Sequence, residues 1–221
     1  MKMKVLWIAG LMLAATAGQV KAGVITSPSA VIGNSMGTFS SVTPGTPRLI
    51  DQSGLPAFTS GVTDYATYLA AIPTHAVFAN SNAWASASGR LTGFLDFDLG
   101  SSRTISGVTL WNQGNNQSIQ NFTILISNDS TFGSSTNAGT FNALQSLSPS
   151  SSVLGATVGQ FARLIVNSNY GSTLTTTLGE IAFDTTDSVS PVPEPASIAM
   201  WGVGALGMMF ARRKRQQKLT A

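Results

Sequence analysis

The segment Gly33-Asn34-Ser35-Met36-Gly37 matches the G-x-S-x-G pattern that surrounds the nucleophile of many serine hydrolases. Asp51 or Asp64 and then His75 follow in the order that such enzymes use. That chemistry needs the serine on a sharp turn between a strand and a helix, with a base in reach. No buried parallel strand is predicted before Ser35 and no helix after it. We therefore predict an ordinary surface turn, with a serine esterase using Ser35 as a remote alternative.

Asp96 and Asp98 are two carboxylates on one face of a predicted strand, about 7 Å apart by the rise of a strand. An inverting glycosidase separates its two carboxyl groups by roughly 6.5–9.5 Å, so the distance alone permits that chemistry. Two acids at alternate positions of an exposed sheet face are ordinarily solvated, and we predict that for this pair. The sequence therefore indicates a protein that is not an enzyme.

Aromatic side chains are the candidates for carbohydrate contact, because a flat ring packs on a sugar while neighbouring amides bind its hydroxyl groups. Tyr170 lies in a polar segment beside Asn169 and is the strongest candidate. Trp84 is a second candidate; the alternative is that Trp84 and Trp111 are core residues of a domain with few large side chains. His75 is predicted to be a surface or capping residue.

Alternating apolar residues predict the strands that must hold these side chains in place. Leu95, Phe97 and Leu99 alternate with the two acids, and Gly100–Ser102 reads as a turn. Further strands are predicted at Ile105–Trp111, Phe122–Ser127, Phe161–Val166 and Leu178–Phe183. One short helix is predicted at Tyr65–Ile72, a loop at Ser146–Ser152 and a linker at Thr185–Pro195. The fold class is all-β, an antiparallel β-sandwich of the jelly-roll type.

Composition and charge exclude several classes of protein. Charged residues make up 10% of the 221 residues, against about 25% in typical soluble domains, which favours a Ser- and Thr-covered sheet protein. The absence of Cys excludes disulfides and thiolate sites, and a single His excludes a multi-His zinc site. Residues 23–194 hold four arginines and all nine acids, a net charge of −5. Nucleic acid is therefore excluded as a partner, because binding it requires clustered Lys and Arg.

Several segments of the predicted sandwich resemble the discoidin family, also called factor V/VIII type C or galactose-binding-like domains. They are Asn82–Ser86, Leu95–Gly100, Ile105–Leu110, Phe122–Asp129, Phe161–Val166 and Leu178–Ile181. The resemblance implies a discoidin-like β-sandwich and a carbohydrate ligand. It also implies a structural Ca²⁺, for which Asp51 and Glu180 are the candidate ligands, since carboxylates and backbone carbonyls suit this hard cation.

Residues 1–22 have the pattern of a secretory signal peptide, which a signal peptidase removes. Lys2 and Lys4 precede the apolar stretch Val5–Ala17, and Val20-Lys21-Ala22 supplies the cleavage site. The alternative is a membrane helix that stays attached, but the apolar stretch is short for the ~20 residues that span a bilayer.

The other end of the chain has three parts in order: a Pro-rich motif, an apolar helix predicted at 196–211, and a basic end. This arrangement resembles a PEP-CTERM sorting tail, with the motif at Pro193, Glu194 and Pro195 and the basic end at Arg212, Arg213, Lys214 and Arg215. The resemblance implies processing by an exosortase of the inner membrane of a Gram-negative bacterium. It implies transient anchoring by the helix, then a cell-surface or extracellular location.

These observations predict four parts: a signal peptide at 1–22, a β-sandwich domain at 23–188, a sorting tail at 189–215 and a cytoplasmic end at 216–221. The leading hypothesis is an exported, non-enzymatic surface or matrix protein that binds polysaccharide of the extracellular polymer, such as that of a biofilm. The alternative is a structural matrix component that self-associates without a specific ligand. Saturable binding that free sugar competes would separate the two.

Overall fold

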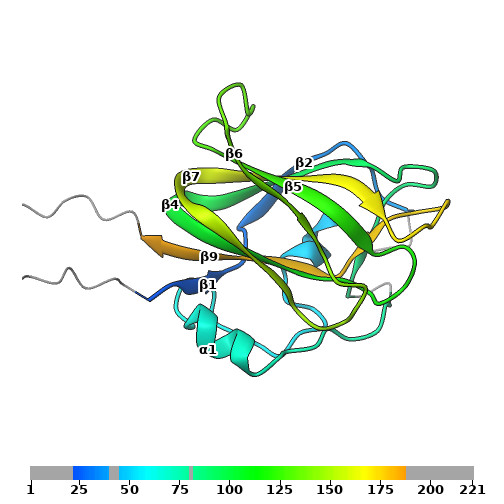
Figure 1. The fold of residues 1–221 in the computed structure, drawn as a ribbon, viewed down its shortest axis with the longest axis horizontal. Helices are drawn as coiled ribbons and strands as arrows, with labels where there is room; N and C mark the ends of the chain where they lie inside the picture. Colours follow the sequence, from blue (N-terminus) through cyan, green and yellow to red (C-terminus); the bar gives the residue numbers. More distant parts are fainter. Residues whose placement is uncertain (1–21, 40–44, 80–81, 188–221) are drawn as a thin grey trace, which may run out of the picture. The chain divides into compact units, whose positions relative to one another are not determined.

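The computed structural model describes residues 22–39, 45–79 and 82–187, and this part of the chain is built mainly of antiparallel strands (Figure 1). The strands are β1 Val24–Thr26, β2 Ala30–Asn34, β3 Trp84–Ala85, β4 Gly93–Trp111, β5 Ile119–Ser127, β6 Thr136–Asn142, β7 Ser150–Asn169, β8 Thr177–Leu178 and β9 Glu180–Asp187. The helical segments are the 3-10 helix η1 Thr46–Leu49 and the α-helix α1 Tyr65–Ala70. The predicted all-β antiparallel sandwich is confirmed.

Two long strands, β4 and β7, connect the layers of the sandwich. The main sheet has the order β1-β9-β4-β7-β5-β6, with β2 paired to β4. The first half of β4 pairs with the second half of β7 (Phe97↔Ala162), and the second half of β4 pairs with the first half of β7 (Val108↔Ser152). The register is interrupted between Asp98 and Arg103, where the pair bends from one layer to the other. We call the layer formed by β2, the first half of β4, the second half of β7, β5 and β6 the wide layer.

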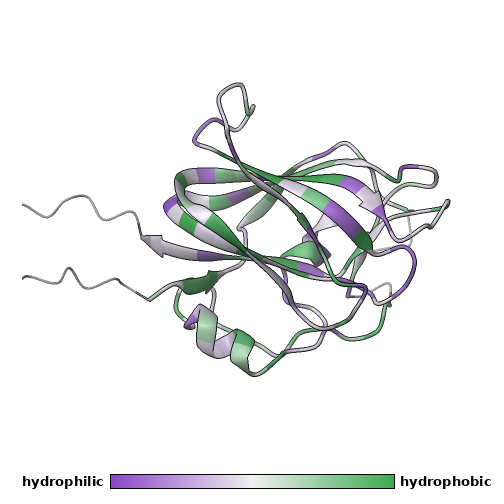
Figure 2. Cartoon of the chain, in the orientation of Figure 1, coloured by the Kyte–Doolittle hydropathy of each residue, from purple (hydrophilic) through white to green (hydrophobic). Residues whose placement is uncertain are grey.

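The core lies between the layers and follows the alternation seen in the sequence, as the green bands on the strands show (Figure 2). Leu95 and Phe97 of β4 are fully buried, as are Phe122 and Ile124 of β5. Side chains of this size each stabilise the fold by roughly 1.5–3 kcal/mol when they leave water. This apolar packing fixes the register of β4, β5 and β7 and hence the positions of the side chains on their outer faces.

The short helix α1 closes a second, smaller apolar cluster. Asp64 caps it by accepting a hydrogen bond from Thr67 N at 2.7 Å. Tyr68 packs edge-on against Trp111, with ring centroids 6.5 Å apart, beside the buried Ile25 of β1. The helix predicted at Tyr65–Ile72 is confirmed over Tyr65–Ala70.

The strand boundaries predicted from the sequence differ from the structure where the strands are half-exposed. The turn predicted at Gly100–Ser102 lies inside the continuous strand β4. The loop predicted at Ser146–Ser152 ends in β7, which begins at Ser150, and the linker predicted at Thr185–Pro195 begins inside β9. These segments are rich in Ser, Thr and Gly, so no apolar alternation marks them as strand.

The first and last described strands lie side by side, because β1 pairs with β9 in the register Val24↔Thr185. Both reach the left side of Figure 1. Within the ranges given above, no helix is long and apolar enough to cross a membrane. The predicted signal peptide, apart from Ala22, and the predicted sorting tail lie outside the described residues.

Candidate functional site

Three loops meet at the end of the sandwich opposite to the start of β1 and the last residue of β9. They are residues 112–118, 143–149 and 170–176, and backbone bonds join them to each other and to their neighbours. Tyr170 N donates to Ser118 O at 3.1 Å, and His75 N donates to Leu147 O at 2.9 Å. The eight residues of β9 run from these loops to the opposite end, about 25 Å at the rise of a strand. We call this end the loop end.

Tyr170 and Asn169, the predicted ligand-binding pair, both lie at the loop end. The Tyr170 hydroxyl donates to Ala143 O at 2.7 Å, which ties two of the loops together and leaves the ring half-buried. The Asn169 amide donates to Ser172 O at 3.2 Å and accepts from Gly171 N at 3.0 Å. Asn169 therefore shapes the loop that carries the tyrosine.

Trp84, the third predicted ligand-binding residue, is fully buried in the main core. Its strand β3 pairs with β8 in the register Trp84↔Leu178. A ring with no exposed surface cannot stack on a sugar while the core stays packed. Trp84 is therefore a core residue, which was the alternative to its role as a ligand-binding residue.

Glu180 and Asp51, the predicted metal ligands, lie beneath the loop end. Glu180 is 0% exposed, and its Oε2 accepts from Gln52 N at 3.0 Å. Burial, followed by repulsion from Asp51, raises the pKa of Glu180 to about 9. Asp51 pairs with Arg48 Nη1 at 2.6 Å and accepts from Ser53 N at 2.9 Å.

These two carboxylates fit a cation that also uses backbone carbonyls. Within the described ranges no three His, Cys, Asp or Glu side chains gather as a metal-binding group. Glu180 Oε1 is buried there without a hydrogen-bond partner, and Gln52 has a φ of 61°, which turns the loop sharply beside it. A carboxyl group buried in this way is stable either as the neutral acid, which the raised pKa of Glu180 favours, or beside a cation that compensates its charge. Where a cation is bound, carboxylate and backbone carbonyl oxygens are ligands that suit Ca²⁺.

His75 is 2% exposed, so the prediction of a surface or capping residue is wrong. Its Nδ1 lies 2.7 Å from Ala76 O and 3.2 Å from Gln113 Nε2. A Cβ on Gly54 or Gly179 would come within 3 Å of the ring, so both glycines provide the space that the histidine occupies. Burial lowers the pKa of His75. No pattern in the sequence indicates Gln113 as a neighbour of His75.

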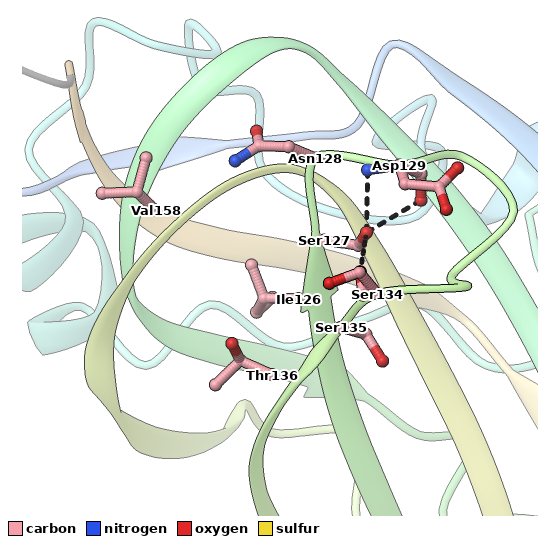
Figure 3. Close-up of a pocket in the computed structure, with 8 residues that line it drawn as sticks. All are labelled: Ile126, Ser127, Asn128, Asp129, Ser134, Ser135, Thr136 and Val158. Atoms are coloured by element: carbon pink, nitrogen blue, oxygen red, sulfur yellow. Dashed lines mark hydrogen bonds between the residues drawn. The ribbon is translucent and has the colours of Figure 1, made fainter.

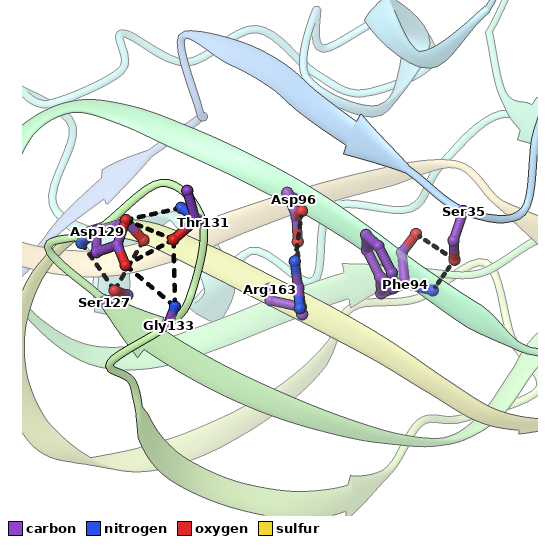
Figure 4. A network of polar contacts seen from close by, with 8 residues as sticks. All are labelled: Ser35, Phe94, Asp96, Ser127, Asp129, Thr131, Gly133 and Arg163. Atoms are coloured by element: carbon purple, nitrogen blue, oxygen red, sulfur yellow. Dashed lines mark hydrogen bonds and ion pairs between the residues drawn. The ribbon is translucent and has the colours of Figure 1, made fainter.

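The Ser35 motif lacks the geometry of a serine nucleophile. Ser35 follows β2, and its hydroxyl accepts from Phe94 N at 2.7 Å and lies 3.3 Å from Phe94 O. These backbone contacts fasten the turn to β4 (Figure 4). A nucleophile instead requires a general base within hydrogen-bond distance of the hydroxyl, and His75 is bonded elsewhere.

Asp96 is 5% exposed, so the prediction that both acids of this strand are solvated is wrong for Asp96. Arg163 holds it in a two-pronged ion pair, with Nε to Oδ1 at 2.6 Å and Nη2 to Oδ2 at 2.9 Å (Figure 4). The guanidinium carbon lies 4.0 Å from the ring centroid of Phe94 and 4.3 Å from that of Phe132. Asp98 accepts from Gly100 N and from Gln160 Nε2. Both acids are held by protein partners.

A pocket of about 390 Å³ lies where β5 turns toward β6 (Figure 3). Ile126 and Val158 form its apolar part, and serines, Asn128 and Asp129 form the rest. Ser127 donates to Ser134 O at 2.6 Å and accepts from Asp129 N at 2.8 Å, which fixes one wall. This pocket is at the end of β5 farthest from Tyr170, and it contains none of the predicted ligand-binding residues.

The domain and the C-terminal end of the chain match known families. The F5/8 type C domain family matches residues 59–178, which are 120 of the 221 residues, and the chain belongs to this family. Residues 191–215 match the PEP-CTERM protein-sorting motif. This motif implies export, processing by an exosortase and a cell-surface or extracellular location. No curated protein sequence gives a significant match to the chain.

Solved structures with the same fold include the C-terminal domain of a chitobiase from Bacteroides fragilis. It is 14% identical, with a TM-score of 0.53, and the match covers 73% of this chain and 97% of that domain. A GH31 CBM32-2 domain bound to GalNAc is 14% identical with a TM-score of 0.49, covering 75% and 100% of the two chains. The family 32 CBM of NanJ from C. perfringens, in complex with galactose, is 12% identical with a TM-score of 0.46, covering 73% and 97%.

Proposed function

We propose that this chain is an exported, non-catalytic protein that binds polysaccharide of the extracellular polymer through its loop end. The observation that carries the proposal is Tyr170, an aromatic ring held half-buried between two loops at that end. Domains of the F5/8 type C family are typically non-catalytic modules that bind carbohydrate. The sorting motif implies a cell-surface or extracellular location, which supports an extracellular polymer as the target.

The loop end offers a sugar a rigid surface with both apolar and polar groups. The hydroxyl bond from Tyr170 to Ala143 fixes the ring, so little side-chain freedom remains to be lost on binding. Leu144 and Leu174, on the two flanking loops, are 56% and 49% exposed. Such a mixture suits a sugar, which presents apolar C–H groups on one face and hydroxyl groups at its edge.

The calcium ion that the fold family implies would support this surface without taking part in chemistry. Glu180 and Asp51 would hold it, and its charge would compensate the buried carboxylate beside the Gln52 turn. The loop of residues 51–55 contacts the His75 segment, since Ala76 N donates to Gly54 O at 2.7 Å. A bound cation would therefore stiffen the base of the loop end.

The direction of β9 supports the assignment of the loop end as the binding surface. The last described residue, Asp187, belongs to the strand end farthest from the loops, and the sorting motif begins at residue 191. The loop end therefore lies at the opposite end of the sandwich from the last described residue, after which the sorting motif follows in the sequence.

Binding is tested with the purified full chain on an array of neutral and acidic polysaccharides, followed by calorimetric titration of each hit. Saturable binding that free oligosaccharide competes is the expected result. Tyr170→Ala is expected to weaken it at least tenfold, because the stacking ring is removed. Tyr170→Phe is the matched control, since it keeps the ring and loses only the bond to Ala143.

The proposal is rejected if the folded chain binds no polysaccharide on the array. Concentration-dependent self-association in sedimentation would then favour the alternative of a structural matrix component. Equal binding by the wild type and Tyr170→Ala would place the ligand elsewhere on the domain.

A further inference from the structure

Five polar side chains on the outer face of the wide layer form one continuous hydrogen-bonded group. They are Asn121 and Thr123 of β5, Thr140 and Asn142 of β6, and Asn167 of β7. Asn167 Nδ2 donates to Asn121 Oδ1 at 2.9 Å and to Thr123 Oγ1 at 3.0 Å. Asn121 Nδ2 donates to Asn142 Oδ1 at 2.8 Å, and the hydroxyls of Thr123 and Thr140 are 2.8 Å apart. We call this group the polar track.

The lateral bonds fix these side chains and still leave groups that point at solvent. Thr140, Asn142 and Asn167 are exposed. Within the described residues, nothing bonds to the amide nitrogen of Asn142 or to the carbonyl oxygen of Asn167. The track therefore presents at least one free donor and one free acceptor, in rotamers already set by the protein. Ligand hydroxyl groups, which both donate and accept, match that mixture at a low cost in side-chain entropy.

The groups on this face favour an uncharged ligand over a polyanion. Arg163 is neutralised by Asp96, and Asp98 is bonded to Gly100 and Gln160. The polar track itself contains only amides and hydroxyls. A polyanion finds no free cation on the track, and the net charge of −5 on residues 23–194 opposes its approach.

The polar track adjoins the loop end that carries Tyr170. Asn142 is followed by Ala143, whose carbonyl accepts the Tyr170 hydroxyl at 2.7 Å. Asn167 precedes Asn169 and Tyr170 at the end of β7, and Ser168 between them bonds to Gln120 Oε1 at 3.2 Å. Strands β6, β5 and β7 lie next to one another in that order (Figure 1). The polar track therefore runs across three strands, about 10 Å from β6 to β7, beside the loop that carries Tyr170.

We propose that the ligand is an extended, uncharged polysaccharide chain whose first sugar lies at Tyr170 and whose following sugars lie on the polar track. This inference rests on the proposed function and specifies its ligand class: an internal stretch of a neutral polymer instead of a single terminal sugar. Sugars beyond the first add affinity through Asn142 and Asn167.

The test measures how affinity depends on ligand length. The purified full chain is titrated with β-1,4-galactan, β-1,4-mannan and β-1,3-glucan and with oligosaccharides of each, from disaccharide to hexasaccharide. The same series is run on the double variant Asn142→Ala/Asn167→Ala. Thr136→Ala is the matched control, because Thr136 is exposed on β6 but lies at the opposite end of that strand.

The expected result is an affinity that rises with length in the wild type and in Thr136→Ala. In the double variant the hexasaccharide is expected to bind about tenfold more weakly, from the loss of two hydrogen-bonding groups, with disaccharide binding unchanged. A length-independent affinity that is equal in all three proteins overturns this inference and leaves the proposed function standing. Absence of binding to every polymer on the wider array rejects the proposed function and this inference with it. A double variant that stops self-associating, with unchanged glycan binding, shows that the track contacts a second copy and also overturns the inference.

Discussion

Replacing Arg163 with methionine should destabilise the domain more than any other arginine substitution in residues 23–187. The side chain of Asp96 is 7% exposed, and its two oxygens each receive a bond from the guanidinium. Without Arg163 the carboxylate stays buried and loses its partner. Breaking a buried ion pair in this way typically costs about 3–5 kcal/mol of unfolding free energy. Arg163 also packs between Phe94 and Phe132, a contact that methionine replaces only in part.

Equilibrium urea unfolding of the full chain measures this effect, with the slope of the transition checked for constancy between variants. A loss of 3–5 kcal/mol corresponds to a fall in melting temperature of roughly 6–20 °C for a domain of this size. The double variant Asp96→Asn/Arg163→Met should recover about half of the loss, because the unpaired charge is gone. Arg90→Met is the control, since Arg90 is exposed on a loop. If Arg163→Met loses no more stability than Arg90→Met, the ion pair does not hold the wide layer together and the reasoning is wrong.

Two further predictions concern the base of the loop end. Calcium at a hundredfold excess over its dissociation constant should stabilise the full chain by about 2.7 kcal/mol in thermal unfolding. Glu180→Gln should remove that stabilisation. Asp129→Asn, in a surface turn remote from the site, should retain it. Equal calcium stabilisation in the wild type and Glu180→Gln would exclude Glu180 as a ligand. Gly54→Ala should cost about 1–3 kcal/mol, because φ is 95° there and a Cβ would lie 2.6 Å from the His75 ring. Gly89→Ala is the control, because Gly89 has a φ of 75° and open space around it, so that this variant measures backbone strain without a clash. A similar loss of unfolding free energy in Gly54→Ala and Gly89→Ala would show that His75 does not fill the space beside Gly54.

The residues that alternate strongly in the sequence are those whose position could be predicted. Leu95, Phe97 and Leu99 face the core as expected, because burial of an apolar side chain depends on its own chemistry and on the strand period. The first half of β7 could not be predicted in this way. Its Ser- and Gly-rich residues pair with β4 through backbone groups, and nothing in the side chains marks that pairing.

The candidate site residues also differ in whether their surroundings could be predicted from local sequence. Tyr170 could be picked out because an aromatic ring in a polar loop is unusual, whereas the burial of His75 depends on Gly54 and Gly179, which are distant in sequence. The ion pair of Asp96 with Arg163 likewise depends on a register between two strands more than sixty residues apart. Pairings across the sheet carry no local signature, so the partners of polar residues were the part that sequence reasoning missed.

The ion pair also explains how a chain with so few charges holds an irregular loop on its surface. Phe132 has a φ of 59°, a conformation that a bulky side chain rarely adopts. The Asp129 carboxylate accepts from Thr131 N and Gly133 N, which holds the loop on both sides of this residue. Phe132 then places its ring over the guanidinium that Asp96 has already fixed. The cation–π contact with the guanidinium that Asp96 orients therefore offsets the strain at Phe132, and we expect this loop to loosen when the ion pair is lost.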